Sequence, residues 1–186
     1  MIECEIKLKI EDINTVKEKL LSLGFKECDS VTETDTYFDN EKNDIRLNDQ
    51  ALRIRETINH TNGNIFCQIN FKDKKFDNNS MSRPEYESEV ASAETILKIL
   101  SCLGYSPVSP KVRKERIFLQ EHSITACLDT VDGLGDFLEL EVIVETEKQK
   151  DQELEKIAGL LDKIGYSIAD TTTTSYLSAL QETISV

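Results

Sequence analysis

The sequence predicts an α+β fold in which eight antiparallel strands form one sheet and helices flank it. Eight stretches alternate apolar and polar side chains with a period of two, as half-buried strands do. Loops rich in Asn, Asp and Gly separate most of these stretches, which favours antiparallel neighbours. Three other segments carry an apolar stripe with helical spacing. No Pro-, Gly- or Ser-rich linker divides residues 1–186, so we expect a single domain.

The first strand shows the alternation most clearly. In IECEIKLKI at 2–10, one face of the extended chain is apolar, while Glu3, Glu5, Lys7 and Lys9 occupy the other. The same period recurs along the chain. The predicted strands are 2–10, 35–39, 51–56, 64–72, 83–90, 111–119, 124–131 and 136–145.

Three predicted helices end with the same signal, a glycine followed by an aromatic residue, in LLSLGF, ILSCLGY and LLDKIGY. Glycine suits the left-handed residue just past a helix end. We expect these helices to start at Asp12, at Ser92 and near Asp151, and a fourth, shorter helix to run through 175–182. The recurrence fits either an internal duplication or a common terminator used three times.

Composition excludes several classes of protein. The 35 acidic and 22 basic residues give a formal charge of −13, which opposes non-specific binding to nucleic acid or anionic membranes. No apolar run approaches the roughly 20 residues of a membrane span, and the start of the sequence does not resemble a signal peptide. The five scattered cysteines have no metal-ligand spacing and fit a reduced, cytoplasmic protein.

The charges on the polar faces of the predicted strands cluster by sign, unlike the mixed outside of an ordinary sheet. Glu139 and Glu141 are the most informative, because they lie in the most apolar strand, where a carboxylate needs a compensating cation or metal. The charged sets are Arg53 with Arg55, Lys114 with Arg116, Lys72 with Lys74, Arg83 with Glu85, Glu87 and Glu89, and Glu139 with Glu141.

Two interpretations of these faces remain. Each strand alone is explained by a solvated exterior. Together they fit a sheet closed into a barrel with the charges inside. Basic residues there would bind phosphates through charge-assisted hydrogen bonds, and paired acids would hold Mg²⁺ or Mn²⁺.

Other chemistries have little support in the sequence. There is no G-x-x-x-x-G-K-[ST] or G-x-G-x-x-G motif, and GLG at 133–135 fits a hairpin turn. His60 and His122 lie in predicted loops, and no Ser–His or Cys–His arrangement is evident. Metal-assisted phosphoryl chemistry is the hypothesis that remains.

The motif E-C-E-I-K at 3–7 resembles the E-x-E-x-K signature of the CYTH superfamily, the triphosphate tunnel metalloenzymes. Further motifs follow in order: DTYFD, LRIR, Lys72, R-x-E-x-E-x-E at 83–89, V-x-K-x-R at 112–116, and LDTVDGLGDFLELE at 128–141. The resemblance covers nearly the whole chain and is strongest to the class IV adenylate cyclase branch, where a GLGDF-type turn is usual.

This resemblance implies a closed eight-stranded antiparallel barrel that binds a triphosphate inside, and it implies site residues by position. Asp129 matches an acid that helps to place metal or nucleophile, and with Lys114 and Arg116 it forms the expected catalytic set. The implied metal ligands are Glu3, Glu5, Glu139 and Glu141; the implied phosphate-binding residues are Lys7, Arg53, Arg55, Lys72, Arg83, Lys114 and Arg116; further tunnel acids are Glu85, Glu87 and Glu89.

Two activities of this family use the same residues. A cyclase converts ATP to cyclic AMP and pyrophosphate, and a triphosphatase hydrolyses thiamine triphosphate, tripolyphosphate or nucleotides. The resemblance to the class IV adenylate cyclase branch favours the cyclase, although Asp73 and Thr174 depart from residues common in cyclases. The non-enzyme alternative is a triphosphate-binding module. Expected partners are a small triphosphate, without nucleic acid or membrane; a homodimer is left open.

Overall fold

The computed structural model describes residues 2–42, 44–76 and 83–184, without the side chains of Ile2, Glu3, Glu147, Lys148 and Lys150. The strands are β1 (Ile2–Lys9), β2 (Lys26–Asp39), β3 (Ala51–Asn59), β4 (Ile65–Lys72), β5 (Arg83–Glu89), β6 (Ser106–Glu121), β7 (Ile124–Val131) and β8 (Gly135–Val144). The helices are α1 (Ile13–Ser22), α2 (Ala93–Cys102), α3 (Glu147–Ile164), the 3₁₀ helix η1 (Ile168–Asp170) and α4 (Tyr176–Ile184).

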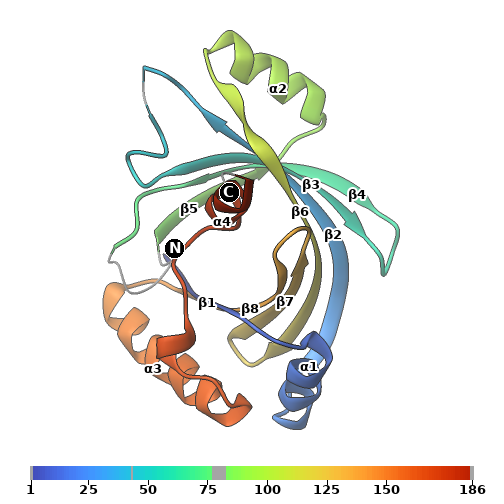
Figure 1. Cartoon of the computed structure of the whole chain (residues 1–186), viewed down its shortest axis with the longest axis vertical. Coiled ribbons are helices and arrows are strands. Elements are labelled where there is room, and N and C mark those ends of the chain that lie inside the picture. The colour runs from blue at the N-terminus through green and yellow to red at the C-terminus, as the bar shows by residue number, and fades with distance from the viewer. Residues whose placement is uncertain (1, 43, 77–82, 185–186) are drawn as a thin grey trace.

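The eight strands form one curled antiparallel sheet around an interior, in the order β5-β4-β3-β2-β6-β7-β8-β1 (Figure 1). β1 pairs with β8 from Ile2↔Val144 to Lys9↔Phe137. On its other side, the described pairing of β1 with β5 consists of Ile2↔Pro84 and Glu3↔Arg83. The predicted eight-stranded antiparallel sheet with flanking helices is therefore confirmed.

Two strands begin well before their predicted first residues. β2 begins at Lys26 and β6 begins at Ser106, and the two pair with each other along most of their length. The extra part of β2, KECDSVTET, is polar on both faces, because its outward positions include Ser30, Thr32 and Thr34 and its inward positions include Asp29 and Glu33. Apolar alternation cannot detect such a strand, whereas backbone pairing with β6 forms it.

The predicted starts of α1 and α2 agree with the structure. Asp12 caps α1, accepting a hydrogen bond from Thr15 N at 2.9 Å, and Ser92 caps α2. α3 starts earlier than the predicted Asp151, at Glu147, because Thr146 N donates to Gln149 Oε1 at 3.1 Å in a capping box. Gly165 ends α3 with a φ of 87°, the left-handed conformation expected there.

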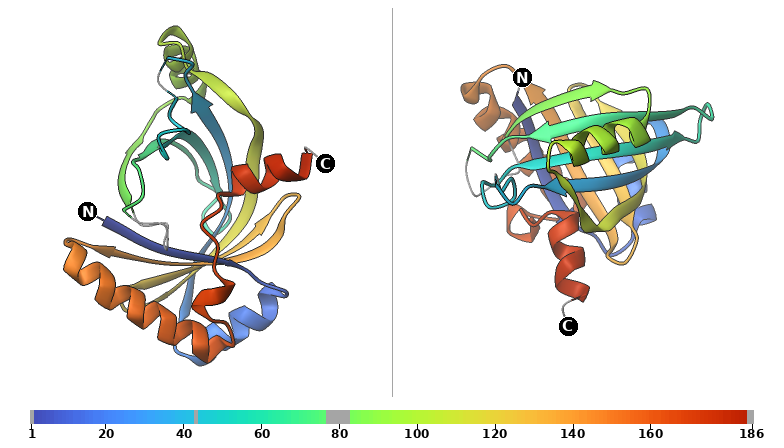
Figure 2. Two further views of the ribbon diagram at one scale, coloured as in Figure 1. Left: turned by 60° about the vertical axis from the view of Figure 1, so that its left-hand side comes forward. Right: turned by 90° about the horizontal axis from the view of Figure 1, so that it is seen from above.

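The apolar core lies outside the curled sheet, between its outer face and the helices. Leu8 and Leu138 are 0% exposed and belong to one cluster with Leu161 of α3 and Leu20 of α1. On the opposite side of the molecule, α2 covers Phe38, Leu52 and Ile54 with Leu100 (Figure 2). Burying each such side chain stabilises the fold by about 1.5–3 kcal/mol.

The position of this core decides which way the charged faces point. Because the side chains of a strand alternate, packing the apolar parity against helices turns the charged parity to the inside of the sheet. Across the described part of the chain, no helix is long and apolar enough to cross a bilayer.

Candidate functional site

The inside of the curled sheet is a cavity of about 990 Å³. Lys7, Lys114 and Arg116 are only 2%, 3% and 5% exposed, so a solvated exterior does not describe them. All seven residues predicted to bind phosphate line this cavity: Lys7, Arg53, Arg55, Lys72, Arg83, Lys114 and Arg116.

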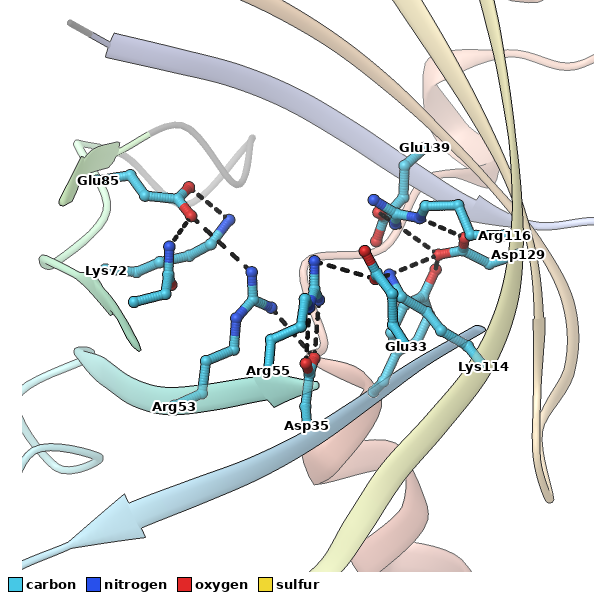
Figure 3. Close-up of polar contacts among 12 residues, drawn as sticks. Glu33, Asp35, Arg53, Arg55, Lys72, Glu85, Lys114, Arg116, Asp129 and Glu139 are labelled. Carbon is cyan, nitrogen blue, oxygen red and sulfur yellow. Dashed lines mark hydrogen bonds and ion pairs between the residues drawn. The ribbon is translucent and has the colours of Figure 1, made fainter. Parts of the chain in front are cut away.

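On β2, the inward acids Glu33 and Asp35 are both matched by cations. Arg55 binds Asp35 through two parallel hydrogen bonds, Nε to Oδ1 at 2.7 Å and Nη2 to Oδ2 at 2.8 Å (Figure 3). Arg53 Nη1 lies 3.3 Å from the same carboxylate. Glu33 Oε2 lies 3.0 Å from Arg55 Nη1 and 3.2 Å from Lys114 Nζ. We call Glu33, Asp35, Arg53 and Arg55 the paired wall.

The electrostatics of the paired wall follow from these contacts. Burial would raise the pKa of Glu33, but Arg55, Lys114 and Arg116 lower that pKa to about 2. Burial opposes ionisation of Asp35 too, yet Arg55 and Arg53 hold its pKa well below the usual range. Both carboxylates are therefore charged at neutral pH and keep the arginines aligned.

Asp129 on β7 lies behind the two cations of β6. It is 0% exposed and accepts from Arg116 Nε and Nη2, each at 2.6 Å, and from Lys114 Nζ at 3.1 Å. Tyr176 Oη donates to it at 3.0 Å. This geometry orients Lys114 and Arg116 toward the cavity; a direct catalytic role for Asp129 stays a prediction.

Among the described side chains of β1 and β8 that line the cavity, three are acids and one, Lys7, is a cation. The register places Glu5 opposite Glu141 and Lys7 opposite Glu139. Arg116 pairs with Glu139 and approaches Glu141 Oε1 at 3.6 Å, while Lys72 Nζ lies 3.7 Å from Glu5 Oε2. We call Glu5, Glu139 and Glu141 the acid-rich wall.

The close spacing of carboxylates on the acid-rich wall favours the protonated form of Glu141. Burial, opposed by Arg116 and reinforced by Glu139 and Glu5, raises the pKa of Glu141 to about 7. Burial also opposes the charge of Glu139, but Arg116, Lys114 and Lys7 hold its pKa well below the usual range. The wall therefore has one carboxylate for which the described cations provide too little positive charge.

The structure describes the side chains of three of the four predicted metal ligands, and these three lie on one wall of the cavity. Glu5, Glu139 and Glu141 share the acid-rich wall, whereas the side chain of Glu3 lies outside the described residues. Within the described ranges, no group of three His, Cys, Asp or Glu side chains is already arranged to hold an ion. The donor chemistry nevertheless fits Mg²⁺ or Mn²⁺, since carboxylate oxygens are hard ligands and Glu141 shares its nearby cation, Arg116, with Glu139 and Asp129.

The predicted run on β5 serves the mouth of the cavity. Arg83 Nη1 donates to the backbone oxygens of Asp49 and Asp73 at 3.2 and 3.4 Å, which ties together the chain at both positions. Glu85 lies 2.9 Å from Lys72 Nζ. Glu87 lines the cavity but is exposed, and Glu89, at the end of the strand, is exposed and does not line it.

Sequence reasoning missed Glu33, Asp35 and Tyr176. The first two share one parity of TETDTYFD, opposite Thr57 and Arg55 of β3, and this parity was the available signal. Tyr176 lies at the start of α4, with Lys7 Nζ 4.5 Å and Lys114 Nζ 5.5 Å from its ring centroid. Both distances suit a cation–π contact.

Lys7 has an unusual environment for a cation. No described side chain forms a hydrogen bond or ion pair with its Nζ within 4.0 Å, and the Tyr176 ring is its near neighbour. Burial lowers the pKa of Lys7, and the charges of Glu139 and Glu5 only partly oppose this. Lys7 is thus poised to accept an anion.

Comparison with known proteins gives a consistent result. The model of the CYTH domain matches residues 1–176. The chain is 38% identical over 177 residues to "Putative adenylate cyclase MJ0240" of Methanocaldococcus jannaschii, covering 95% of this chain and 97% of that one. It superposes on PH1819 from Pyrococcus horikoshii with a TM-score of 0.88 and 29% identity, over 97% and 99% of the two chains.

A more distant structure shares the fold. "Putative adenylyl cyclase HpAC1" from Hippeastrum, described as having a dominant triphosphatase activity, superposes with a TM-score of 0.66 and 18% identity, over 98% of this chain and 95% of that one. The family model spans the strands that carry both walls of the cavity and ends at Tyr176. The chain belongs to the CYTH domain family.

Proposed function

We propose that this protein is a metal-dependent enzyme that converts ATP to cyclic AMP and pyrophosphate inside a closed barrel of its eight strands. The observation that carries the proposal is the convergence of seven basic side chains on one cavity of about 990 Å³. The 38% identity to "Putative adenylate cyclase MJ0240" supports the choice of cyclase. We place the activity in one domain over residues 1–186, in the cytoplasm.

The basic residues would bind the triphosphate by exchanging partners. In the structure, Arg55 and Lys114 contact Glu33, and Arg116 contacts Glu139. Phosphate oxygens are equally good acceptors for these donors, and Asp129 keeps Arg116 and Lys114 oriented during the exchange. Lys7, without a described anionic partner, would bind phosphate without giving one up.

In the cyclisation, the ribose 3′-oxygen forms a bond to the α-phosphorus and the bond from that phosphorus to the bridging oxygen of pyrophosphate breaks. The hydroxyl proton passes to solvent. Positioning and neutralisation of charge supply most of the catalysis in such transfers. The arginines and lysines of the cavity would stabilise the charge that develops on the pyrophosphate.

A divalent ion, Mg²⁺ or Mn²⁺, would add positive charge next to the phosphates when bound. Glu5, Glu139 and Glu141 would hold it, together with Glu3 as the sequence predicts. The raised pKa of Glu141 supports this assignment, because a cation at the acid-rich wall would favour its charged form.

A triphosphatase is the second candidate. The cations of the cavity contact phosphate rather than the group attached to it, so they would equally bind thiamine triphosphate or tripolyphosphate. In that reaction water would attack a terminal phosphorus. A binding module is less well supported, because anion capture needs no buried acid-rich wall.

Product analysis tests the proposal. The protein is incubated with Mg²⁺ or Mn²⁺ and, separately, with ATP, thiamine triphosphate or tripolyphosphate. Cyclic AMP with equimolar pyrophosphate is the expected result for ATP, and excess chelator should abolish it. Orthophosphate as the sole product would replace the cyclase by the triphosphatase, and unchanged substrates throughout would overturn both.

A further inference from the structure

The segment that leads into α4 is fixed against β1 at Lys7. Thr171 pairs with Leu8 in an isolated antiparallel bridge (Figure 2). Thr172 N donates to Lys7 O at 2.8 Å. α4 begins four residues later, at Tyr176, whose ring centroid lies 4.5 Å from Lys7 Nζ. The backbone and the side-chain tip of Lys7 therefore both contact this part of the chain, which holds the start of α4 beside them.

The first turn of α4 has backbone donors without an acceptor. Ser175 caps the helix, because its Oγ accepts from Ser178 N at 3.1 Å. The two amides between them, of Tyr176 and Leu177, donate to no described residue, as the first amides of a helix have no partner within it. Residues 173–178 all line the cavity. The wall of the cavity thus includes two N–H groups at the positive end of a helix of nine residues.

A helix start alone is not a binding site, since water can satisfy its amides. Lys7 provides the independent observation. It is 2% exposed, and its Nζ forms no hydrogen bond or ion pair with a described side chain. A buried ammonium group without a counter-ion is costly, so this place requires negative charge.

Nearby acids do not supply that charge. Glu139 is opposite Lys7 in the pairing of β1 with β8, but it pairs with Arg116. The first turn of α4 contains no acid. The half-buried Thr173 also lines the cavity, and its hydroxyl forms no hydrogen bond with a described residue. The donors at this place are therefore an ammonium group, a hydroxyl and two amides, a set that suits a phosphoryl group.

We propose that Lys7, the Thr173 hydroxyl and the backbone N–H groups of Tyr176 and Leu177 bind one phosphoryl group of the triphosphate. We call these four groups the α4 anion site. The inference rests on the proposed function and adds a helix to the strands that bind the substrate. α4 has no Lys or Arg, and it needs none, because backbone amides at a helix start bind phosphate themselves.

Ser175→Asp tests the site with a fixed negative charge. Asp caps helices about as well as Ser, so α4 should stay folded, while the new carboxylate competes with phosphate for Lys7 and the amides. Calorimetric binding is measured in excess chelator, where no turnover is expected. Tripolyphosphate and ATP should each bind about 10-fold or more weakly, because both carry the phosphoryl group that the site recognises.

Ser92→Asp is the matched control. Ser92 caps α2 in the same way, accepting from Thr95 N at 3.2 Å, and it does not line the cavity. The control has the same change in net charge and in helix cap. It should bind both ligands within about twofold of the unchanged protein, since salt screens a distant surface charge.

A second measurement needs no variant. In nitrogen–proton correlation spectra of the unchanged protein, saturating tripolyphosphate should move the amide signals of Tyr176 and Leu177 downfield, because both N–H groups gain an anionic acceptor. Ala93 and Glu94 occupy the same two positions of α2, and their amide signals should stay in place.

The outcomes separate the inference from the function on which it rests. If Ser175→Asp binds both ligands as tightly as Ser92→Asp, or if the Tyr176 and Leu177 signals do not move at saturation, α4 does not bind phosphate and only the inference fails. If the unchanged protein binds neither ligand, the proposed function fails and the inference falls with it. Weaker binding confined to Ser175→Asp, together with the downfield shifts, supports the inference.

Discussion

Glu33 and Glu141 are both carboxylates on the wall of one cavity, yet their pKa values lie on opposite sides of the ordinary value of 4.5. On the paired wall, Arg55 and Lys114 lower the pKa of Glu33 to about 2. On the acid-rich wall, burial and the neighbours Glu139 and Glu5 raise the pKa of Glu141 to about 7. The difference lies in the number of cations per acid and not in burial, since both side chains are mostly buried.

This comparison indicates a different role for each wall of the cavity. The paired wall has a preassembled set of cations whose carboxylates keep them aligned, which suits a phosphate chain. The acid-rich wall has surplus negative charge, which suits a divalent cation. A triphosphate with its metal ion has both kinds of charge and would satisfy both walls at once.

The largest expected effect comes from removing a phosphate-binding cation. Arg55→Ala or Arg116→Ala should lower kcat/KM for ATP by about 10²–10³-fold, the usual loss when a donor to developing charge is removed. Steady-state kinetics on purified variants measures it. Arg113→Ala is the control, because Arg113 lies on the same strand as Arg116 with its side chain 45% exposed. Equal activity of the Arg116 and Arg113 variants would contradict a role of the cavity cations.

Removing an acid of the paired wall should destabilise the protein. The pKa of Glu33 is lowered from 4.5 to about 2, so its charge stabilises the fold above pH 4.5, and this stability is lost as pH falls through 2. Glu33→Gln should therefore cost about 3 kcal/mol at pH 7. Urea unfolding at several pH values checks this. The difference from the unchanged protein should narrow below pH 4.5; a gap that does not depend on pH would contradict the charge argument.

On the acid-rich wall, replacing an acid is expected to stabilise the protein rather than destabilise it. The pKa of Glu141 is raised from 4.5 to about 7, so ionisation of Glu141 destabilises the metal-free fold increasingly as pH rises through this range. In chelator, Glu141→Gln should stabilise the protein at pH 8 by up to about 3 kcal/mol and leave it unchanged at pH 4. Thermal unfolding at the two pH values measures this. Destabilisation at pH 8 would show that the two walls do not differ as described.

A smaller effect is expected where α4 meets the cavity. Tyr176→Phe removes the hydrogen bond to Asp129 but keeps the ring beside Lys7, so it should cost about 1 kcal/mol of stability. Tyr176→Leu removes the ring too and should also raise KM for ATP, since Lys7 loses its neighbour. Unfolding and kinetics on both variants separate the two contributions. Identical KM values for the Phe and Leu variants would show that the ring does not position Lys7.

Much of this site follows from strand parity alone. Because side chains alternate, the one-signed sets on LRIR, VRKER and ELE predict which residues share a face, and the structure places those cations in one cavity. The CYTH resemblance adds which acids face them. For Glu33 and Asp35 the shared parity was only a weak signal, because β2 is polar on both faces and its length depends on pairing with β6.

The remaining features depend on three-dimensional surroundings. Tyr176 comes from α4, far along the chain from Lys7 and Asp129, and only the packing of α4 on β6 brings them together. The raised pKa of Glu141 depends on how many cations reach β8, which spacing along one strand does not determine. The α4 anion site likewise depends on the hydrogen bond from Thr172 N to Lys7 O, which joins residues far apart in the sequence.

The division between the walls is tested most directly by calorimetric titration of Mn²⁺ into the unchanged protein, Glu139→Gln and Glu33→Gln. The account predicts that Glu139→Gln weakens Mn²⁺ binding at least about 10-fold, since a ligand of the acid-rich wall is lost. Glu33→Gln, confirmed as folded by circular dichroism, should keep the affinity within about twofold. Equal losses in the two variants, or unchanged binding by Glu139→Gln, would contradict it.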